Sequence, residues 1–226
     1  MSDSHDQDHG KATERFRWLL DYRLDGDLRF ISHHDTLRLF RRALARAEIP
    51  VRFTGGFNPH PRIMIPLPRP VGVASEAESL VMETESPIDA AEAMRCLGDQ
   101  LPRGLEMLAA RRLARDERIQ PETARYRLAW EDDRPADLDE RIERIMESDA
   151  VAIERTHATT GKRRSLNIRP YIVRIQPIEC ELEMTLRVTN RGTVRPAEVA
   201  GLLGCDPRAV NHRIRRVAVE WSFTEA

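Results

Sequence analysis

The run Ser32-His33-His34-Asp35 is the first cluster of side chains that could do chemistry. A histidine beside a carboxylate can bind a metal or move protons, so His33 and Asp35, together with His60, are candidate metal ligands or acid–base groups. The S-x-x-D spacing also fits a helix N-terminal cap, and we expect capping to occupy Ser32 and Asp35. Adjacent helical residues point about 100° apart, so only one of the two histidines faces a given site, and His33 is the preferred candidate.

A second candidate site is the loop at residues 57–62, Phe-Asn-Pro-His-Pro-Arg. Two prolines flank His60 and fix its backbone, which would hold a binding side chain in place at low entropic cost. The amide of Asn58 can both donate and accept hydrogen bonds. The loop is therefore either a rigid turn with a solvent-exposed histidine or a preorganised binding loop.

Basic residues gather at Gly161-Lys162-Arg163-Arg164, and Tyr171 follows closely. Cations that meet backbone phosphates and an aromatic ring that stacks on bases are the residue types used to bind RNA. Tips of β-hairpins are often basic without such a role. The binding hypothesis thus names Lys162, Arg163, Arg164 and Tyr171, and it leaves the ordinary hairpin tip as the alternative.

A stripe of arginines recurs every four residues at Arg38, Arg42 and Arg46 on a predicted amphipathic helix. Such a stripe is usually a solvated face, but Arg38 and Arg42 are candidate phosphate contacts. Only Lys11 and Lys162 among the 36 basic residues are lysines. Arginine binds phosphate bidentately, although a G+C-rich genome would also explain the bias.

These candidates lie on a chain whose pattern predicts an α+β fold of two ferredoxin-like modules (βαββαβ) with antiparallel sheets. Residues 1–14 read as a disordered tail, 15–115 as the first module and 122–226 as the second, with a linker at 114–123. In the second module we expect strands at 126–130, 151–156, 179–189 and 217–223, helices at 135–148 and 197–203, and an insertion at 159–177. A groove between two such modules would be a common place for a ligand.

Composition excludes several classes of protein. The chain has 226 residues, of which 41% are hydrophobic and 32% charged, with a net charge of −1, which is typical of a folded water-soluble protein and not of a disordered or globally basic one. No apolar run is long enough to span a membrane and the N-terminus does not resemble a secretory signal, so we expect a cytoplasmic protein. Cys96, Cys180 and Cys205 are widely spaced, which argues against disulfides and a cysteine metal cluster. Motifs of common nucleotide-binding and protease chemistries are absent from the sequence.

The segment from Tyr22 to Glu85 resembles the radical SAM-linked protein family, a bacterial domain found alone or attached to radical S-adenosylmethionine (radical SAM) enzymes. The residues that carry the resemblance, in order, are Asp27-Leu28-Arg29-Phe30-Ile31-Ser32-His33, Asp35, Gly56-Phe57-Asn58-Pro59-His60-Pro61, Leu67-Pro68, Val71-Gly72-Val73 and Ser75-Glu76-Ala77-Glu78. The segment 166–172 is similar to the family's second-half motif. His34 stands where the family usually has an apolar residue, and Asn167 where it usually has an aspartate.

The resemblance implies association with a radical SAM enzyme. Radical SAM chemistry needs a Cys-x3-Cys-x2-Cys loop that this chain does not have, so it would take place on the partner, and we expect no cofactor in the chain itself. The leading hypothesis is an accessory binding module that helps such an enzyme contact RNA. The alternatives are an enzyme or metal-binding protein that uses His33, Asp35 and His60, and a scaffold whose groove holds a partner peptide. The site hypotheses assume that the turn with Asn58 and His60 folds over the start of the arginine-striped helix to form one pocket.

Overall fold

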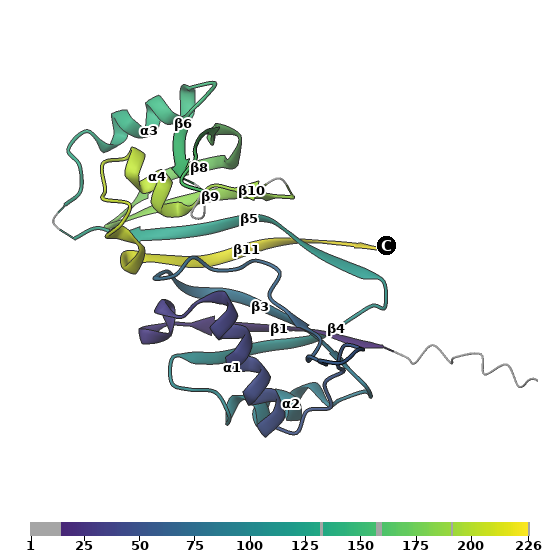
Figure 1. Cartoon of the computed structure of the whole chain (residues 1–226). Coiled ribbons are helices and arrows are strands. Elements are labelled where there is room, and N and C mark those ends of the chain that lie inside the picture. Colours follow the sequence, from purple (N-terminus) through teal and green to yellow (C-terminus); the bar gives the residue numbers. More distant parts are fainter. Residues whose placement is uncertain (1–14, 132, 157–159, 191, 226) are drawn as a thin grey trace, which may run out of the picture.

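The computed structural model describes residues 15–131, 133–156, 160–190 and 192–225. It is a mixed α+β structure with a large, mostly antiparallel sheet and four α-helices among these residues (Figure 1). Helices α1 and α2 lie beside the strands of the N-terminal half, and α3 and α4 lie beside those of the C-terminal half. No helix in the described part of the chain is long and apolar enough to cross a membrane.

The N-terminal half begins with a strand whose alternate residues Trp18, Leu20, Tyr22 and Leu24 are buried against the helices. Ser32 caps the first helix, because its hydroxyl accepts a 3.1 Å hydrogen bond from the backbone N–H of Asp35. The predicted cap is therefore confirmed. The elements of this half are β1 (Phe16–Leu24), α1 (His33–Arg46), β2 (Ile63–Met64), β3 (Ala74–Thr84), α2 (Ala90–Gly98) and β4 (Leu105–Leu113), with a 3-10 helix at Gly26–Phe30.

The C-terminal half contains β5 (Glu117–Ala129), α3 (Leu138–Glu147), β6 (Ala152–Thr156), β7 (Arg163–Asn167), β8 (Ile172–Ile178), β9 (Glu181–Thr189), β10 (Gly192–Thr193), α4 (Pro196–Leu202) and β11 (Ile214–Glu225). Two 3-10 helices, at Arg169–Tyr171 and Val210–Arg213, connect some of these elements. The apolar faces of α3 and α4 pack on β5 and β9 to form the core of this half.

All the strands except β6 and β7 join into one sheet in the order β10-β9-β5-β11-β3-β1-β4, with β2 beside β3 and β8 beside β9. This differs from the separate sheets expected for two modules. The connection is β11, which pairs antiparallel with β5 along its length and parallel with β3 at Arg215 and Arg216. Parallel pairing between strands so far apart in sequence leaves no local sequence signal.

Two predictions for the C-terminal half are wrong. Most of the predicted linker at 114–123 is strand, because β5 starts at Glu117 and pairs with β11 through a register irregularity near Pro121. The strand predicted at 151–156 is confirmed as β6, but its predicted place in the sheet of the second module is wrong, because it pairs with β7 in a separate two-stranded sheet. The strand next to β9 is instead β8, which lies almost wholly in the predicted insertion.

The segment between β2 and β3 ties the two halves together. Leu67 and Val73 belong to the core of the C-terminal half. Arg69 donates hydrogen bonds to the carbonyls of Leu28, Arg29, Pro70 and Val73. Several residues of the quoted sequence motifs therefore have a structural role at this junction, and the candidate sites lie on either side of it.

Candidate nucleic-acid interface

The β6–β7 hairpin and the turn before β8 enclose a cavity of about 320 Å³. Its walls are Arg155, Arg164, Leu166, Tyr171, Gly192 and Thr193. Arg164 and Tyr171, two residues proposed from the sequence for RNA contact, therefore lie at one site. The hairpin projects near α3, at the far end of the molecule from α1 and α2 (Figure 1).

Strand alternation directs Arg164 and Arg163 to opposite faces of the hairpin. Arg164 lies opposite Arg155 on the paired strand and shares a face with Leu166, which packs against the core. Arg163 points to the outer face and forms an exposed ion pair of 3.5 Å with Glu154. Of these two arginines, Arg164 is thus the one that lines the cavity, while Lys162 and Arg163 are exposed near the hairpin tip.

The charge of Arg155 is already compensated within the protein. Its guanidinium donates to both carboxylate oxygens of Glu198, at 2.8 and 2.7 Å, and to the carbonyl of Thr193 at 2.9 Å. The hydrogen bonds to Glu198 raise the pKa of Arg155 above its ordinary value. Arg164 has no carboxylate partner within the described ranges, so it supplies the uncompensated positive charge at this cavity.

Tyr171 is held at the cavity by the turn that precedes β8. Asn167 fixes the base of this turn, because its side-chain oxygen accepts hydrogen bonds from the backbone N–H groups of Val151 (2.9 Å) and Arg169 (3.1 Å). Arg169 donates to the carbonyls of Ile172 and Met146. The half-buried Tyr171 therefore has a fixed backbone and lines the same cavity as Arg164. An aromatic ring and a guanidinium at one cavity can stack on a base and bind its phosphate.

His33 lies in the other half, at a small enclosed space of about 10 Å³ beside Tyr22, Thr36, Arg69 and Glu78. A space of this size holds about one water molecule. Partial burial, and next the neighbouring His34, lower the pKa of His33, while Glu78 opposes the shift. Neither Asn58 nor His60 lines this space, so it is not the shared pocket that we expected.

The carboxylate of Asp35 forms its hydrogen bonds with residues of α1 and its N-terminal cap. Its carboxylate accepts hydrogen bonds from the Ser32 hydroxyl (2.7 Å) and from Arg38 (3.0 Å). The Ser32 hydrogen bond lowers the pKa of Asp35. Within the described residues, no three His, Cys, Asp or Glu side chains are grouped so that they could hold a metal, and this includes the set His33, Asp35 and His60.

The loop that carries Asn58 and His60 projects from the N-terminal half. Its base is closed by hydrogen bonds from the Thr54 N–H to the His60 carbonyl (2.8 Å) and from the His60 N–H to the Thr54 hydroxyl (2.9 Å). Residues 55–60 are all exposed, and Phe57 is completely so. The loop therefore has a hydrogen-bonded base and an accessible tip.

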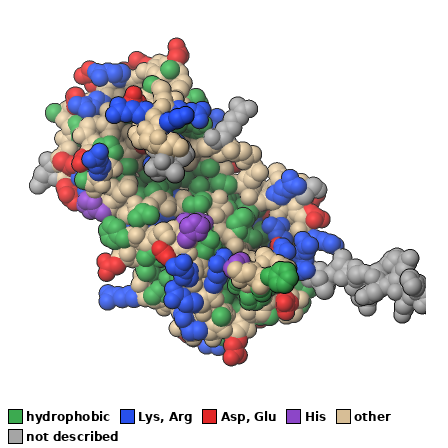
Figure 2. Space-filling view, in the orientation of Figure 1, with side chains coloured by type: hydrophobic (Ala, Val, Ile, Leu, Met, Phe, Trp, Pro, Cys, Tyr) green, Lys and Arg blue, Asp and Glu red, His purple; other side chains and the backbone are tan. Residues whose placement is uncertain are grey.

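Basic side chains occur on both halves of the face seen in Figure 2, with hydrophobic and neutral surface between them. Arg38 and Arg42 belong to the N-terminal half, on α1, and Arg42 lines a separate cavity with Arg46. The structure thus divides the candidate binding residues into a hairpin group, Lys162, Arg163, Arg164 and Tyr171, and a group in the N-terminal half, Arg38, Arg42, Asn58 and His60.

Sequence reasoning missed Arg155 and Glu198. These residues are 43 positions apart, and no local spacing connects them. The one feature of the sequence that could have indicated this pair is the charged Arg155, which lies in a strand that otherwise alternates apolar and polar residues. The buried pair Arg216 and Glu78, 138 positions apart, was missed for the same reason.

Residues 17–196 match a family described as "Uncharacterized protein conserved in bacteria (DUF2344)". The chain belongs to this family. A search of curated proteins found no match. Among solved structures, the "Crystal Structure of an Unknown Protein from Galdieria sulphuraria" is similar over 94% of this chain and 99% of that one, with 11% sequence identity and a TM-score of 0.25.

Proposed function

We propose that this member of the family is a non-catalytic binding module that helps a radical SAM enzyme engage an RNA substrate. The observation that carries the RNA part is the cavity lined both by Tyr171 and by Arg164, which has no carboxylate partner among the described residues. Stacking on an aromatic ring contributes about 1–3 kcal/mol per base in single-stranded complexes, and arginine adds a phosphate contact. Lys162 and Arg163, near the hairpin tip, would meet neighbouring phosphates.

The radical SAM part of the proposal rests on the resemblance of residues 22–85 and on the cysteines. Cys96, Cys180 and Cys205 are too widely spaced in sequence to form a Cys-x3-Cys-x2-Cys loop. A partner would therefore supply the iron–sulfur cluster and the reaction. Because RNA and such enzymes meet in the bacterial cytoplasm, the proposal places this protein there as well.

We also propose that each half is a ferredoxin-like module. The strand order β4-β1-β3-β2 supports this in the N-terminal half, and β11-β5-β9-β8 supports it in the C-terminal half. In both orders the first strand lies between the third and the fourth, which is the arrangement of a βαββαβ unit. The β6–β7 hairpin is then an addition to the second module, and it carries the candidate RNA site.

Fluorescence anisotropy with a labelled single-stranded RNA of about eight nucleotides tests the RNA part. We expect Arg164→Gln to weaken binding about fivefold and to reduce the slope of log K against log salt by about one. Tyr171→Leu should weaken binding about tenfold with little change in that slope, because a ring is lost and not a charge. Arg208→Gln, at an exposed position of another turn, is the matched control and should bind as the wild type does.

Two results would overturn the RNA assignment. One is the absence of salt-dependent RNA binding by the wild-type protein. The other is an Arg163/Arg164→Ala variant that keeps full affinity with the same salt slope. The enzyme part has its own test, crosslinking and pull-down from the native bacterium. Enrichment of a radical SAM protein over a mock bait is expected, and its absence in repeated experiments would contradict the partnership.

A further inference from the structure

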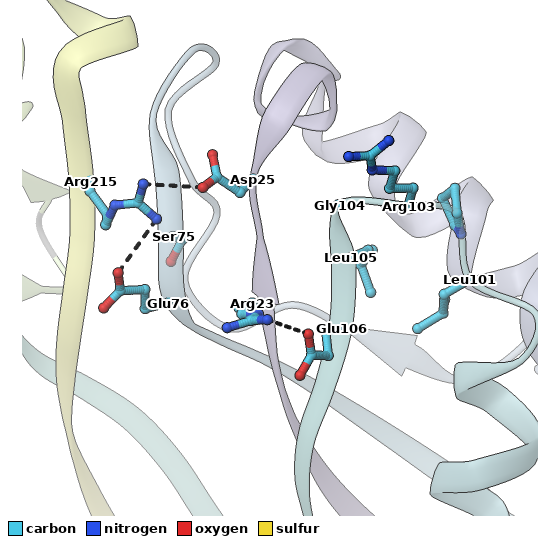
Figure 3. Close-up of a pocket in the computed structure, with 11 residues that line it drawn as sticks. Arg23, Asp25, Ser75, Glu76, Leu101, Arg103, Gly104, Leu105, Glu106 and Arg215 are labelled. Carbon is cyan, nitrogen blue, oxygen red and sulfur yellow. Dashed lines mark hydrogen bonds and ion pairs between the residues drawn. The ribbon is translucent and has the colours of Figure 1, made fainter.

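Two cavities flank the turn between α2 and β4, and both are lined by Leu101 and Pro102. The first, of about 580 Å³, lies where β1, β3, β4 and β11 come together (Figure 3). The second, of about 510 Å³, runs along the polar side of α1 and includes Arg42 and Arg46. Together we call these two cavities the arginine groove.

Five arginines and five carboxylates line the arginine groove, so its lining alone is balanced, but some carboxylates pair with arginines outside the lining. Each of its five carboxylates has an arginine partner: Asp25 with Arg29 and Arg215, Glu76 with Arg215, Glu106 with Arg23, Asp35 with Arg38, and Asp99 with Arg95. Figure 3 shows three of these pairs, at Asp25, Glu76 and Glu106.

Three arginines of the groove have no carboxylate partner in the part of the chain that the structure describes. Arg42 and Arg103 have no ion pair there, and Arg46 donates only to the side chain and carbonyl of Gln100, which are neutral. All three lie next to the turn formed by Leu101 and Pro102. Because Arg29, Arg38 and Arg95 pair with carboxylates of the groove from outside its lining, an excess of positive charge remains next to this turn and attracts an anionic ligand.

The remaining lining distinguishes a peptide from a nucleic acid. Leu28, Ile31, Leu39, Leu101 and Leu105 provide aliphatic surface in the two cavities. Neither cavity is lined by a described aromatic residue or histidine, so bases would find no ring on which to stack. Aliphatic surface between guanidinium groups instead complements a peptide that alternates leucine-like and acidic side chains.

We propose that the arginine groove binds an acidic, leucine-containing segment of a partner protein. This inference deepens the proposed function, since a groove in the N-terminal half would hold the partner while the β6–β7 hairpin in the other half contacts RNA. It assigns Arg42 to a protein contact, although the sequence suggested a phosphate contact. Arg42, Arg46 and Arg103 meet the carboxylates of the segment, and Leu39 and Leu101 contact its apolar side chains.

Anisotropy with a fluorescein-labelled peptide of about twelve residues that repeats Leu-Glu-Glu tests the inference, with a Leu-Gln-Gln peptide as the uncharged probe. The acidic peptide should bind the full-length protein, more weakly as salt rises, and the uncharged peptide should not. Arg42→Gln, Arg46→Gln and Arg103→Gln should each weaken binding about two- to fivefold, and the triple variant by about tenfold or more. Arg208→Gln is again the control and should have no effect.

The outcomes separate the groove from the RNA site. The groove inference is wrong if the acidic peptide does not bind the wild-type protein. It is also wrong if Arg208→Gln weakens peptide binding as much as the groove variants do. It is also wrong if the groove variants lose affinity for the labelled RNA and not for the peptide, because the groove would then bind phosphate. Unchanged RNA binding by the triple variant, together with lost peptide binding, is the expected result. The Tyr171→Leu variant should show the reverse and remain a full peptide binder.

Discussion

Arg216 donates a 2.8 Å hydrogen bond to Glu78 where both side chains are buried, with exposed fractions of 1% and 2%. Arg216 belongs to β11 of the C-terminal half and Glu78 to β3 of the other. Arg216 also donates to the carbonyls of Leu67 and Pro68, and its guanidinium lies 5.6 Å from the ring centre of Tyr126. This ion pair therefore fixes how the halves meet.

Replacing Glu78 by alanine should lower the free energy of unfolding by about 3–5 kcal/mol. The variant removes the carboxylate whose attraction offsets the cost of burying the Arg216 charge, so that charge stays buried and uncompensated. Glu140→Ala breaks an exposed ion pair, with Arg144, and should cost less than about 1 kcal/mol. Urea unfolding measures both. Equal losses of unfolding free energy in the two variants would show that burial does not determine how much the Glu78–Arg216 ion pair contributes to stability.

Gly104 should not tolerate a side chain. Its φ is +94°, and a Cβ placed there would lie 2.7 Å from the backbone oxygen of Asp25. We expect Gly104→Ala to lower the free energy of unfolding by about 1–3 kcal/mol through strain and the displaced backbone. Gly98→Ala is the matched control, because Gly98 is helical and its Cβ would meet open space, so this variant should be neutral or up to about 1 kcal/mol more stable. Chemical unfolding measures both free energies of unfolding. A Gly98→Ala variant less stable than Gly104→Ala would contradict the predicted clash at Gly104.

What the sequence predicted well was local. The S-x-x-D cap and the amphipathic pattern predicted α1, and the strand expected at 179–189 coincides closely with β9. Such features depend on residues a few positions apart. The parallel pairing of β11 with β3 depends on contacts more than a hundred residues apart, which no local pattern encodes.

In the candidate site, too, the sequence predicted contacts between neighbouring residues and missed contacts between distant ones. Arg164 and Tyr171 were found because they lie seven positions apart in one basic segment, and the structure places them at one cavity. Arg155, which also lines that cavity, is held by a long-range ion pair with Glu198. We expected His33 and His60 to share one pocket, although nothing in the sequence shows that their two motifs lie close together in space. The space beside His33 does not include His60.

The protonation of His33 should make stability depend on pH. Its pKa is lowered in the folded protein, first by burial and then by His34, so the unfolded chain binds more protons as the pH falls through the ordinary histidine range. The free energy of unfolding should consequently fall between about pH 7.5 and about pH 5.5, and His33→Gln should remove part of this fall. Urea unfolding at several pH values measures it. His60→Gln, at an exposed loop position, should keep the wild-type dependence, and an identical dependence in the His33 variant would disprove the assignment.

Asn167 should act through its side-chain oxygen and not as an acid or base. That oxygen accepts from the N–H groups of both Val151 and Arg169, so Asn167→Ala should cost about 1 kcal/mol of unfolding free energy by leaving the two donors without this acceptor. Asn167→Asp keeps an acceptor, which as a carboxylate binds N–H groups more strongly, and should be neutral or stabilising at neutral pH. Asn58→Ala, on the exposed loop, controls for loss of an amide and should change little. If the aspartate and alanine variants are equally destabilised in urea, the position is selected for the amide N–H₂ group and not for its oxygen.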